Sequence, residues 1–315
     1  MEALTKIVVM LSLAVAAFGQ PPAVPGWKLS IGELRKQYNH YGVGRRLKPV
    51  VWPNNSRVAV ALSFDSENAT AALAKGEFGS SAMSRGMYGS IDGLPRILNM
   101  LDRRNVPASF FIPAVCALLN PEMIPLILSK KRHEIGVHGW IHENPATLND
   151  AAEESRLLKQ AIAVLTKAMG KRPAGYRAPS WAMSPYTMGL VREAGFLYDS
   201  SLMASDGAYE VTIDGRSSGV IELPIEGILD DYPYFGAADG SLPSPELVDR
   251  IYRAEFDVAY QEGGLFILTM HPHITGHRSR VLWLERLIEY MKSKPGVWFA
   301  TLEEAARYVK EHSGK

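Results

Sequence analysis

Two histidines four residues apart, His138 and His142, are the first residues of this chain whose spacing indicates chemistry. An apolar run with strand character, residues 135–137, comes directly before His138. If the chain turns helically after that strand, residues i and i+4 project from one face and can bind one metal ion. Neutral imidazole suits zinc and neighbouring transition metals. Because such pairs also occur on solvated helix faces, this one needs support from elsewhere in the chain.

Polar residues at the ends of other apolar runs give that support. The first predicted strand ends in Asp65, and Glu67 lies two residues further on. Alternate residues of an extended segment point the same way, so both carboxylates can reach one rim. Arg177, Asp199 and His271 each follow or end a later predicted strand. In parallel α/β barrels the chemistry lies at the carboxyl ends of the strands, so these residues predict one shared site.

Repeated strand–helix units must position these residues. The predicted strands are 57–65, 108–112, 134–137, 175–177, 196–198, 220–224, 265–270 and 297–300. The predicted helices are 94–104, 121–130, 150–170, 185–194, 246–262 and 281–292, with a turn-rich segment at 204–219. The alternation indicates a parallel α/β fold. Seven or eight short strands in about 250 residues favour a barrel over an open sheet.

Composition limits the function classes. A chain of 315 residues with 47% hydrophobic and 21% charged residues can bury a large core. The formal net charge of +1, without a basic stripe, gives no reason to expect nucleic acid as a partner. Cys116 is the only cysteine, which excludes an intrachain disulfide and a thiolate metal cluster.

The N-terminus resembles a secretory signal. Lys6 supplies a positive charge, Ile7–Phe18 is apolar, and small residues at 16–19 offer a cleavage site. The apolar run is short for a membrane span, although an uncleaved anchor is the alternative. We expect residues 1–19 to be a signal peptide, 20–56 an N-terminal extension and 57–315 the catalytic domain. The mature protein is then secreted or periplasmic without a stable membrane span, and its oligomeric state is left open.

An ordered set of motifs carries a resemblance to a known family. The set is FDSE (64–67), HGWIH (138–142), RAPSW (177–181), YDSS (198–201) and LTMHPH (268–273). It resembles the polysaccharide deacetylase superfamily, the nodulation-deacetylase-like carbohydrate esterases of family 4, over about residues 57–305. The resemblance implies a distorted (β/α) barrel of seven or eight strands. It also implies one divalent metal ion, usually zinc, held by an acid and two histidines, and hydrolysis of an N-acetyl or related amide.

The resemblance also implies the metal ligands and the base. His138 and His142 correspond to the two histidine ligands. Many members carry two adjacent aspartates in the first motif, of which the first is the base and the second a ligand. This chain has Asp65-Ser66-Glu67, the spacing of the subset that resembles bacterial peptidoglycan deacetylases. Glu67 is therefore expected as the third ligand and Asp65 as the general base. Three protein ligands leave a position for water, whose pKa falls to about 7 on zinc.

The remaining motifs imply the other roles. Arg177 resembles the motif arginine that orients the base, and a guanidinium fork suits that task. His271 is expected to be the general acid that protonates the leaving amine. Asp199 is expected either to tune His271 through a hydrogen bond or to be a turn aspartate. Four further residues are expected to line the substrate pocket, with the core as an equal alternative for the two tryptophans: Trp140, Pro179, Ser180 and Trp181.

The predicted function is a metal-dependent hydrolase that removes N-acetyl groups from an amino-sugar glycan by attack of metal-activated water on the amide. Two alternatives stay open: a hydrolase of a small non-peptide amide, similar to allantoinase, and a catalytically inactive glycan-binding protein on the same fold. An acid at Glu67 beside both histidines favours a metal enzyme. The joint presence of Asp65, Arg177 and His271 argues against an inactive binding protein.

Overall fold

The computed structural model describes residues 24–130, 132–148, 150–236 and 242–313, so the predicted signal peptide at 1–19 lies outside the described residues. The chain divides into two units, Met1–Tyr38 and Asn39–Lys315. In the first unit, the described residues form a short 3₁₀ turn, η1 (Gly26–Lys28), and one helix, α1 (Ile31–Tyr38). No helix in the described part of the chain is long and apolar enough to cross a membrane.

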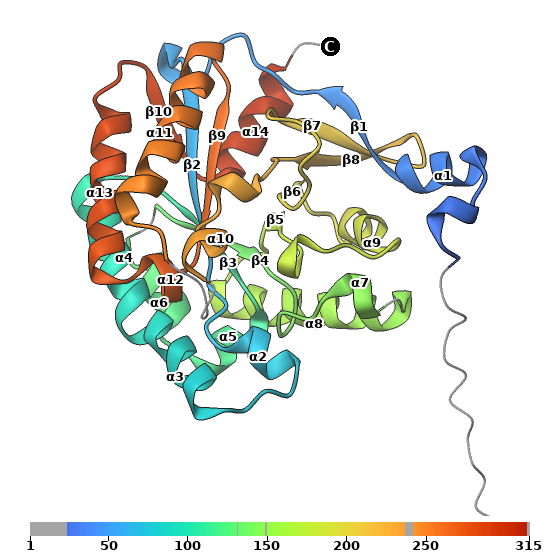
Figure 1. The fold of residues 1–315 in the computed structure, drawn as a ribbon, viewed down its shortest axis with the longest axis horizontal. Helices are drawn as coiled ribbons and strands as arrows, with labels where there is room; N and C mark the ends of the chain where they lie inside the picture. The colour runs from blue at the N-terminus through green and yellow to red at the C-terminus, as the bar shows by residue number, and fades with distance from the viewer. Residues whose placement is uncertain (1–23, 131, 149, 237–241, 314–315) are drawn as a thin grey trace, which may run out of the picture. The chain divides into compact units, whose positions relative to one another are not determined.

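The second unit alternates strands and helices (Figure 1). Its strands are β1 (Tyr41–Arg46), β2 (Val58–Asp65), β3 (Ser109–Ile112), β4 (Glu134–Val137), β5 (Gly175–Tyr176), β6 (Tyr198–Asp199), β7 (Tyr209–Ile213), β8 (Arg216–Glu222), β9 (Leu265–Met270) and β10 (Val297–Ala300). Its α-helices are α2 (Thr70–Ala74), α3 (Ser80–Tyr88), α4 (Leu94–Arg104), α5 (Ala114–Leu119), α6 (Met123–Leu128), α7 (Pro145–Leu148), α8 (Ala151–Met169), α9 (Thr187–Glu193), α10 (Tyr232–Phe235), α11 (Pro245–Glu262), α12 (Pro272–Thr275), α13 (Arg278–Lys292) and α14 (Leu302–His312). Shorter turns are the 3₁₀ segments η2 (Pro53–Asn55), η4 (Pro179–Trp181) and η5 (Gly227–Leu229), and the π-helical turn η3 (Gly89–Gly93).

All the strands join one curled sheet, which confirms the expected α/β fold of the distorted barrel type, here as a half-barrel. The order is β1-β7-β8-β6-β5-β4-β3-β2-β10, and β9 pairs with β2. The strands from β8 to β2, together with β9 and β10, run parallel, whereas β1 and β7 are antiparallel to their partners. Between β8 and β9 the described residues form no ladder, only one isolated bridge between Asp230 and Thr269 further along the chain. The barrel therefore has a seam at this place.

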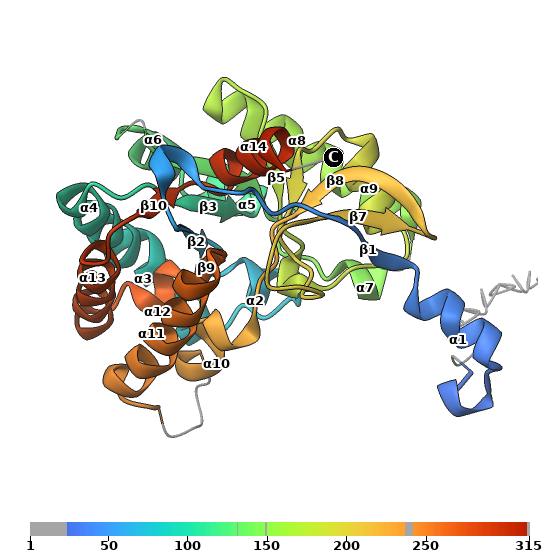
Figure 2. The same cartoon turned by 90° about the horizontal axis from the view of Figure 1, so that it is seen from above.

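The central strand β2 is buried on both faces, which explains its continuous apolar sequence. Val60, Leu62 and Phe64 belong to the larger core, which also contains residues of α4 and α13. Ala59 and Ala61 face the other way and belong to a second core with residues of α14. Helices α4, α11 and α13 lie together on one side of the sheet (Figures 1 and 2). The polar end of β2, at Asp65, therefore continues the inward-facing row of Ala59 and Ala61.

Two strands differ from the sequence-based predictions. The segment 204–219 was predicted to be turn-rich, but β7 and the first part of β8 form a hairpin there. Its two turn residues, Asp214 and Gly215, have φ of 48° and 75°, as a tight two-residue hairpin requires. Strand β1 comes from the predicted N-terminal extension and pairs antiparallel with β7. The unit Asn39–Lys315 therefore includes part of the predicted N-terminal extension.

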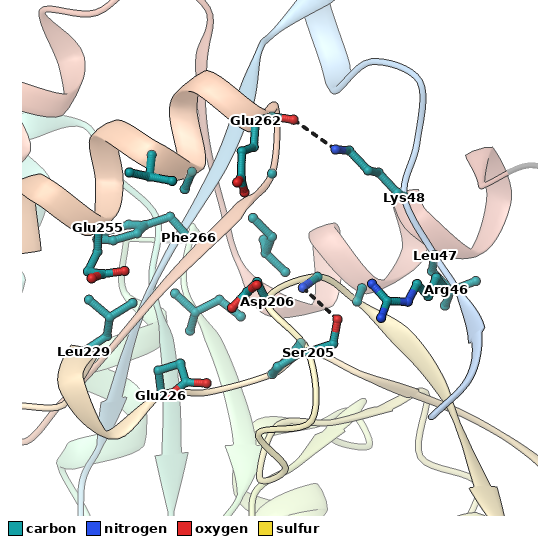
Figure 3. Close-up of a pocket in the computed structure, with 18 of the residues that line it drawn as sticks. Arg46, Leu47, Lys48, Ser205, Asp206, Glu226, Leu229, Glu255, Glu262 and Phe266 are labelled. Atoms are coloured by element: carbon teal, nitrogen blue, oxygen red, sulfur yellow. Dashed lines mark hydrogen bonds between the residues drawn. The ribbon is translucent and has the colours of Figure 1, made fainter. Parts of the chain in front are cut away.

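A cavity of about 360 Å³ lies at the seam (Figure 3). Residues 265–267 of β9 and Leu229 line it, together with the segment that follows β1. At its rim the Lys48 ammonium donates a hydrogen bond to the Glu262 carbonyl oxygen at 2.9 Å (Figure 3). None of the residues that we predicted for catalysis or metal binding lines this cavity. The candidate active site therefore lies elsewhere, at the carboxyl ends of the strands.

Candidate active site

The pairing of β2 with β9 brings two predicted catalytic residues together. The two strands run parallel in a register that sets Phe64 opposite Met270, so Asp65 and His271 follow at the same edge. Direct pairing of the two strands therefore brings the two residues together, although no ladder closes the barrel between β8 and β9 among the described residues.

Glu67, His138 and His142 converge on one point. The Glu67 Oε1 atom lies 2.8 Å from His142 Nε2 and 3.4 Å from His138 Nε2. One donor atom from each of the three residues lies within 4.8 Å of the other two. The backbone turns sharply at His142, whose φ is 65°, and this left-handed conformation accompanies the return of the ring towards Glu67. The predicted ligand set is thus brought together in space.

The donor chemistry of this cluster fits a divalent metal ion. His138 Nδ1 donates to the Arg177 carbonyl oxygen at 2.9 Å, which leaves Nε2 as the ring nitrogen that faces Glu67 at 3.4 Å. With Nδ1 as the donor, the neutral tautomer of the ring would present its Nε2 lone pair to a cation placed between this nitrogen and the Glu67 carboxylate. The buried Nε2 of His142 has no hydrogen-bond partner among the described residues. One carboxylate oxygen and two imidazole nitrogens are ligands that zinc accepts.

Two other groups of acids and histidines nearby suit a metal less well. In the group Asp230, Asp231 and His271, the Asp231 carboxylate already accepts three hydrogen bonds. In the group Asp65, Glu67 and His271, one oxygen of Asp65 already accepts a hydrogen bond from the Arg177 guanidinium. These carboxylates are occupied with fixing other side chains. The cluster of Glu67, His138 and His142 is the one that retains uncommitted donor atoms.

The charge state of Glu67 suits a ligand. Burial alone would raise its pKa, but the interactions with His142, His138 and His271 hold that pKa well below its usual range. For His142, burial opposes the charge and the Glu67 carboxylate favours it, with a raised pKa as the result. A proton on His142 competes with a metal ion for the same lone pair. Metal affinity at this cluster is therefore expected to fall as the pH is lowered.

Asp65 is held by a buried guanidinium. Arg177 Nη1 donates to Asp65 Oδ1 at 2.7 Å and to Ser63 Oγ at 3.0 Å. Its Nε and Nη2 donate to the carbonyl oxygen and hydroxyl of Ser200. The guanidinium lies over the Phe111 ring, 4.2 Å from the centroid, and is fully buried. The other carboxylate oxygen, Asp65 Oδ2, lies 3.8 Å from His138 Nε2 and so faces the ligand cluster.

His271 is held by a residue that we did not predict. Asp231 Oδ1 lies 2.6 Å from His271 Nδ1, and Asp231 Oδ2 accepts the His271 backbone N–H. Burial would lower the pKa of His271, but the carboxylates of Asp231 and Glu67 outweigh it and raise that pKa well above its usual value. The opposite ring nitrogen, Nε2, lies 3.7 Å from Glu67 Oε1. His271 thus presents a protonated nitrogen to the ligand cluster.

Of the two roles expected for Asp199, the hydrogen bond to His271 is made by Asp231 instead, which leaves the role of a turn aspartate. The Asp199 carboxylate instead accepts hydrogen bonds from the backbone N–H and the hydroxyl of Ser201. Asp231 escaped prediction because it follows the 3₁₀ turn η5, a segment without strand character. The adjacent acids Asp230 and Asp231, between two predicted strands, were the available sequence signal.

The four predicted pocket residues lie on two neighbouring turns. Gly139 and Pro179 are so close that a Cβ atom on Gly139 would lie 2.8 Å from the proline ring. Ser180 and Trp181 both have φ of 54°, a left-handed conformation. Ser180 is exposed, Trp181 and Trp140 are half-buried, and Pro179 is buried. Trp140 packs against the larger core, so at least part of its ring has a structural role.

Several known proteins are similar to this chain in sequence and in fold. Residues 86–198 match the family model described as polysaccharide deacetylase. The peptidoglycan deacetylase of Helicobacter pylori is 30% identical over 260 residues, which cover 73% of this chain and 88% of the relative. A crystal structure described as a polysaccharide deacetylase from Mycobacterium smegmatis has a TM-score of 0.77 at 33% identity, covering 86% of this chain and 96% of that one. Puue allantoinase has a TM-score of 0.74 at 26% identity, covering 82% and 91%.

Proposed function

Because this chain belongs to the polysaccharide deacetylase family, we propose that it removes N-acetyl groups from an amino-sugar glycan with the help of one divalent metal ion. Family membership makes the chain a hydrolase of carbon–nitrogen bonds other than peptide bonds. The observation that carries the finer proposal is the convergence of Glu67, His138 and His142 on one point, with Asp65 and His271 beside it. The peptidoglycan substrate in the name of the Helicobacter pylori relative supports a glycan substrate.

Glu67, His138 and His142 are the proposed metal ligands, and zinc is the proposed metal. When bound, a divalent ion supplies a Lewis acid that polarises the acetyl carbonyl and lowers the pKa of water. The Arg177 carbonyl keeps the His138 ring oriented for this task through the hydrogen bond to Nδ1. Ionised Glu67 contributes the negative charge of the ligand set.

Asp65 is the proposed general base. Its Oδ1 is committed to Arg177, so Oδ2 is the atom that accepts a proton from the attacking water. Because Arg177 donates to Asp65, Ser63 and Ser200 together, the carboxylate cannot rotate without breaking a buried network. Fixing the base in this way reduces the reorganisation that the reaction requires.

His271 is the proposed general acid. Asp231 holds Nδ1 and keeps the ring protonated, so Nε2 is the atom that donates a proton to the amide nitrogen as it leaves. Amide hydrolysis requires this proton, because an unprotonated amine is a poor leaving group. Asp65 ends β2 and His271 follows the neighbouring strand β9, and donor atoms of both residues lie within 4.8 Å of each other and of Glu67.

A second candidate function is hydrolysis of a small amide. The likeness to Puue allantoinase, over 82% of this chain, favours it. The two candidates differ in the size of the substrate, and Ser180 on the turn next to Gly139 is exposed to solvent. We propose the glycan as the first choice of substrate.

We also propose that the protein is exported, which suits a glycan substrate outside the cytoplasm, and that the mature N-terminus lies near Gln20. A full-length chain retained in the cytoplasm would contradict this proposal.

One experiment tests the proposal. Purified protein is assayed for acetate release from peptidoglycan and from N-acetylglucosamine oligomers, and for turnover of allantoin. Metal content is measured on the same preparation. We expect acetate release, about one divalent ion per chain, and loss of activity on chelation that zinc restores. Turnover of allantoin without acetate release would favour the second candidate, and activity that survives complete removal of metal would refute the metal assignment.

A further inference from the structure

Two buried carboxyl groups lie behind the catalytic centre and have no role in the proposed chemistry. Asp199 ends β6 and Glu222 ends β8, and the parallel pairing sets the two residues opposite each other. Both are fully buried, with no exposed surface. Two ionised carboxylates buried away from water would repel each other strongly. The hydrogen-bond partners of the two groups therefore decide whether one of them keeps a proton.

Backbone amides occupy one side of the pair. Glu222 Oε1 accepts hydrogen bonds from the backbone N–H groups of Ser201 and Leu202, at 2.9 and 3.0 Å. Asp199 accepts from the Ser201 N–H at 3.1 Å and from its hydroxyl at 2.8 Å. The other oxygen, Glu222 Oε2, meets no donor group in the described part of the chain. A proton on one of the two carboxyl groups supplies the missing donor and joins them by a hydrogen bond.

The surroundings favour that proton. Burial raises the pKa of Asp199 to about 6, and burial together with Asp199 raises the pKa of Glu222 well above its usual value. Other ionisable side chains that act on the pair come from β1, β7, β5 and the residue after β5: Tyr41, Tyr209, Tyr176 and Arg177. Burial raises the pKa of all three tyrosines, so they are neutral at physiological pH. Arg177 is thus the charged member of this group.

Hydrogen bonds connect the pair to the catalytic base. Ser201 Oγ accepts the Ala178 backbone N–H at 2.8 Å, which anchors the turn carrying Ser180 and Trp181. The neighbouring residue Ser200 accepts two hydrogen bonds from the Arg177 side chain, one at its carbonyl oxygen and one at its hydroxyl. The same guanidinium holds Asp65. Residues 200–201 are therefore the link between the carboxyl pair and the base.

We propose that Asp199 and Glu222, sharing one proton, are a positioning pair that fixes Ser200 and Ser201 and thereby orients Arg177 and Asp65. This inference rests on the role of Asp65 proposed above. When hydroxide removes the shared proton, two carboxylates face each other and the hydrogen bond between them is lost. Ser200 and Ser201 then lose their fixed position. Part of the loss of turnover at alkaline pH therefore originates behind the active site, in residues that never touch substrate.

Substitutions at Glu222 test the pair. Glu222→Gln keeps an oxygen for the two backbone amides and donates from its amide nitrogen to Asp199, without a proton to lose. Glu222→Leu has a similar volume but leaves the Leu202 N–H without its acceptor and removes the partner of Asp199 in the shared-proton hydrogen bond, while Ser201 keeps its bonds to Asp199. We expect Glu222→Leu to lower kcat at least about tenfold with KM and metal content within about twofold of the wild type. Glu222→Gln should restore kcat and show a smaller fall of kcat at alkaline pH than the wild type.

Glu134→Gln is the matched control. Glu134 is also a fully enclosed carboxyl group, but it lies at the amino ends of the strands. Its substitution should leave the pH profile of kcat unchanged. The proposal is overturned if Glu222→Leu keeps wild-type kcat per folded molecule, or if Glu222→Gln loses turnover at alkaline pH as the wild type does.

A second measurement separates this inference from the proposed function. The infrared carbonyl band of a protonated carboxylic acid should be present in the wild type at neutral pH. In Glu222→Gln, this band should lose the part of its intensity that comes from the proton shared by Asp199 and Glu222. If the wild type neither binds metal nor deacetylates a glycan, the proposed function fails while this band still tests the shared proton. If the enzyme is active and the band is unchanged by Glu222→Gln, the shared proton is refuted.

Discussion

Two polar clusters lie at opposite ends of the same parallel strands, and they differ in how completely they are satisfied. At the amino ends, Glu134 accepts hydrogen bonds from the Tyr198 hydroxyl, the Ser109 hydroxyl and the Glu303 backbone N–H. All of these donors are neutral, and both carboxyl oxygens are occupied. At the carboxyl ends, Glu67 faces the rings of His138 and His142, and among the described residues the buried His142 Nε2 makes no hydrogen bond of good geometry although Glu67 Oε1 lies 2.8 Å away.

This difference in hydrogen bonding indicates a structural role for the Glu134 cluster and a chemical role for the Glu67 cluster. The Glu134 cluster fixes the start of α14, since Glu303 and the neighbouring Leu302 lie in its first turn. Such a network is complete without any ligand, and it stabilises the fold. The Glu67 cluster has no such set of neutral donors around it among the described residues, and it is where we propose that a cation binds. In α/β barrels, residues at the amino ends of the strands contribute to stability, and residues at the carboxyl ends carry the activity.

The largest effect should come from removing a proposed metal ligand. His138→Ala takes away one imidazole and its orienting bond to the Arg177 carbonyl. We expect metal content to fall close to zero and turnover to fall by more than the roughly 10²–10⁴-fold typical of losing a general base. Metal analysis and acetate release measure the two quantities. A variant that keeps both would show that His138 is not a ligand.

The next effect concerns the base and the acid. Asp65→Asn and His271→Ala should each lower turnover on the order of 10²–10⁴-fold, because each removes one proton transfer. Metal content should stay unchanged, unlike in His138→Ala. In the double variant the two losses should not multiply, since groups that act as a unit are non-additive. If Asp65→Asn keeps near-wild-type activity, the base is another residue and Glu67 is the candidate.

A smaller effect should follow from Asp231→Asn. Burial lowers the pKa of His271, and Asp231 is the first of the groups that raise it, so the substitution lowers that pKa. The acid must be protonated to act, and a lower pKa means that it loses its proton at lower pH. The alkaline limb of kcat should therefore move to lower pH, with about a tenfold loss at neutral pH. An unchanged alkaline limb would argue that Asp231 has no influence on the acid.

The smallest effect on turnover should come from Glu134→Gln, with its consequence in stability. Burial raises the pKa of Glu134, so its stabilising contribution is present below the pKa of the unfolded chain. That contribution is lost as the pH rises through the higher pKa of the folded protein. Glutamine has no proton to lose, so the free energy of unfolding should depend less on pH in this range. Denaturant titrations at several pH values measure it, and turnover per folded molecule should not change.

Sequence reasoning predicted the parts of the site that follow strands. Asp65 and His271 come at the ends of long apolar runs, and His138 follows a short one, so the rule about strand ends was enough to group them. The structure confirms the predicted α/β fold of the distorted barrel type. Asp231 was missed because its contact with His271 depends on how the chain returns after β8, which no local pattern encodes. The assignment of Asp199 to His271 failed for the same reason.

The edge of the sheet was missed for a different reason. Arg216, Ser217 and Ser218 have low strand propensity, but pairing between β7 and β8 overrides it. The Asp214–Gly215 turn was the signal that could have revealed this hairpin, since both residues adopt positive φ. Strand β1 contains two glycines, and a Cβ atom on Gly44 would lie only 2.7 Å from the Glu210 carbonyl oxygen. Close approach to β7 explains those glycines, which from sequence alone read as a loop.

The pairing of β2 also sets the order in which the protein can be made. Both β9 and β10 hydrogen-bond to this eight-residue apolar strand, and both come from the last part of the chain. During synthesis or refolding, β2 therefore keeps open edges until residues beyond 264 have arrived. Open apolar edges recruit other chains, so incomplete molecules should aggregate through this segment. Chains that have not yet paired β2, the strand that ends in Asp65, with β9 and β10 should therefore be the ones that most depend on a chaperone. Catalytic activity should be the last property that a refolding chain regains.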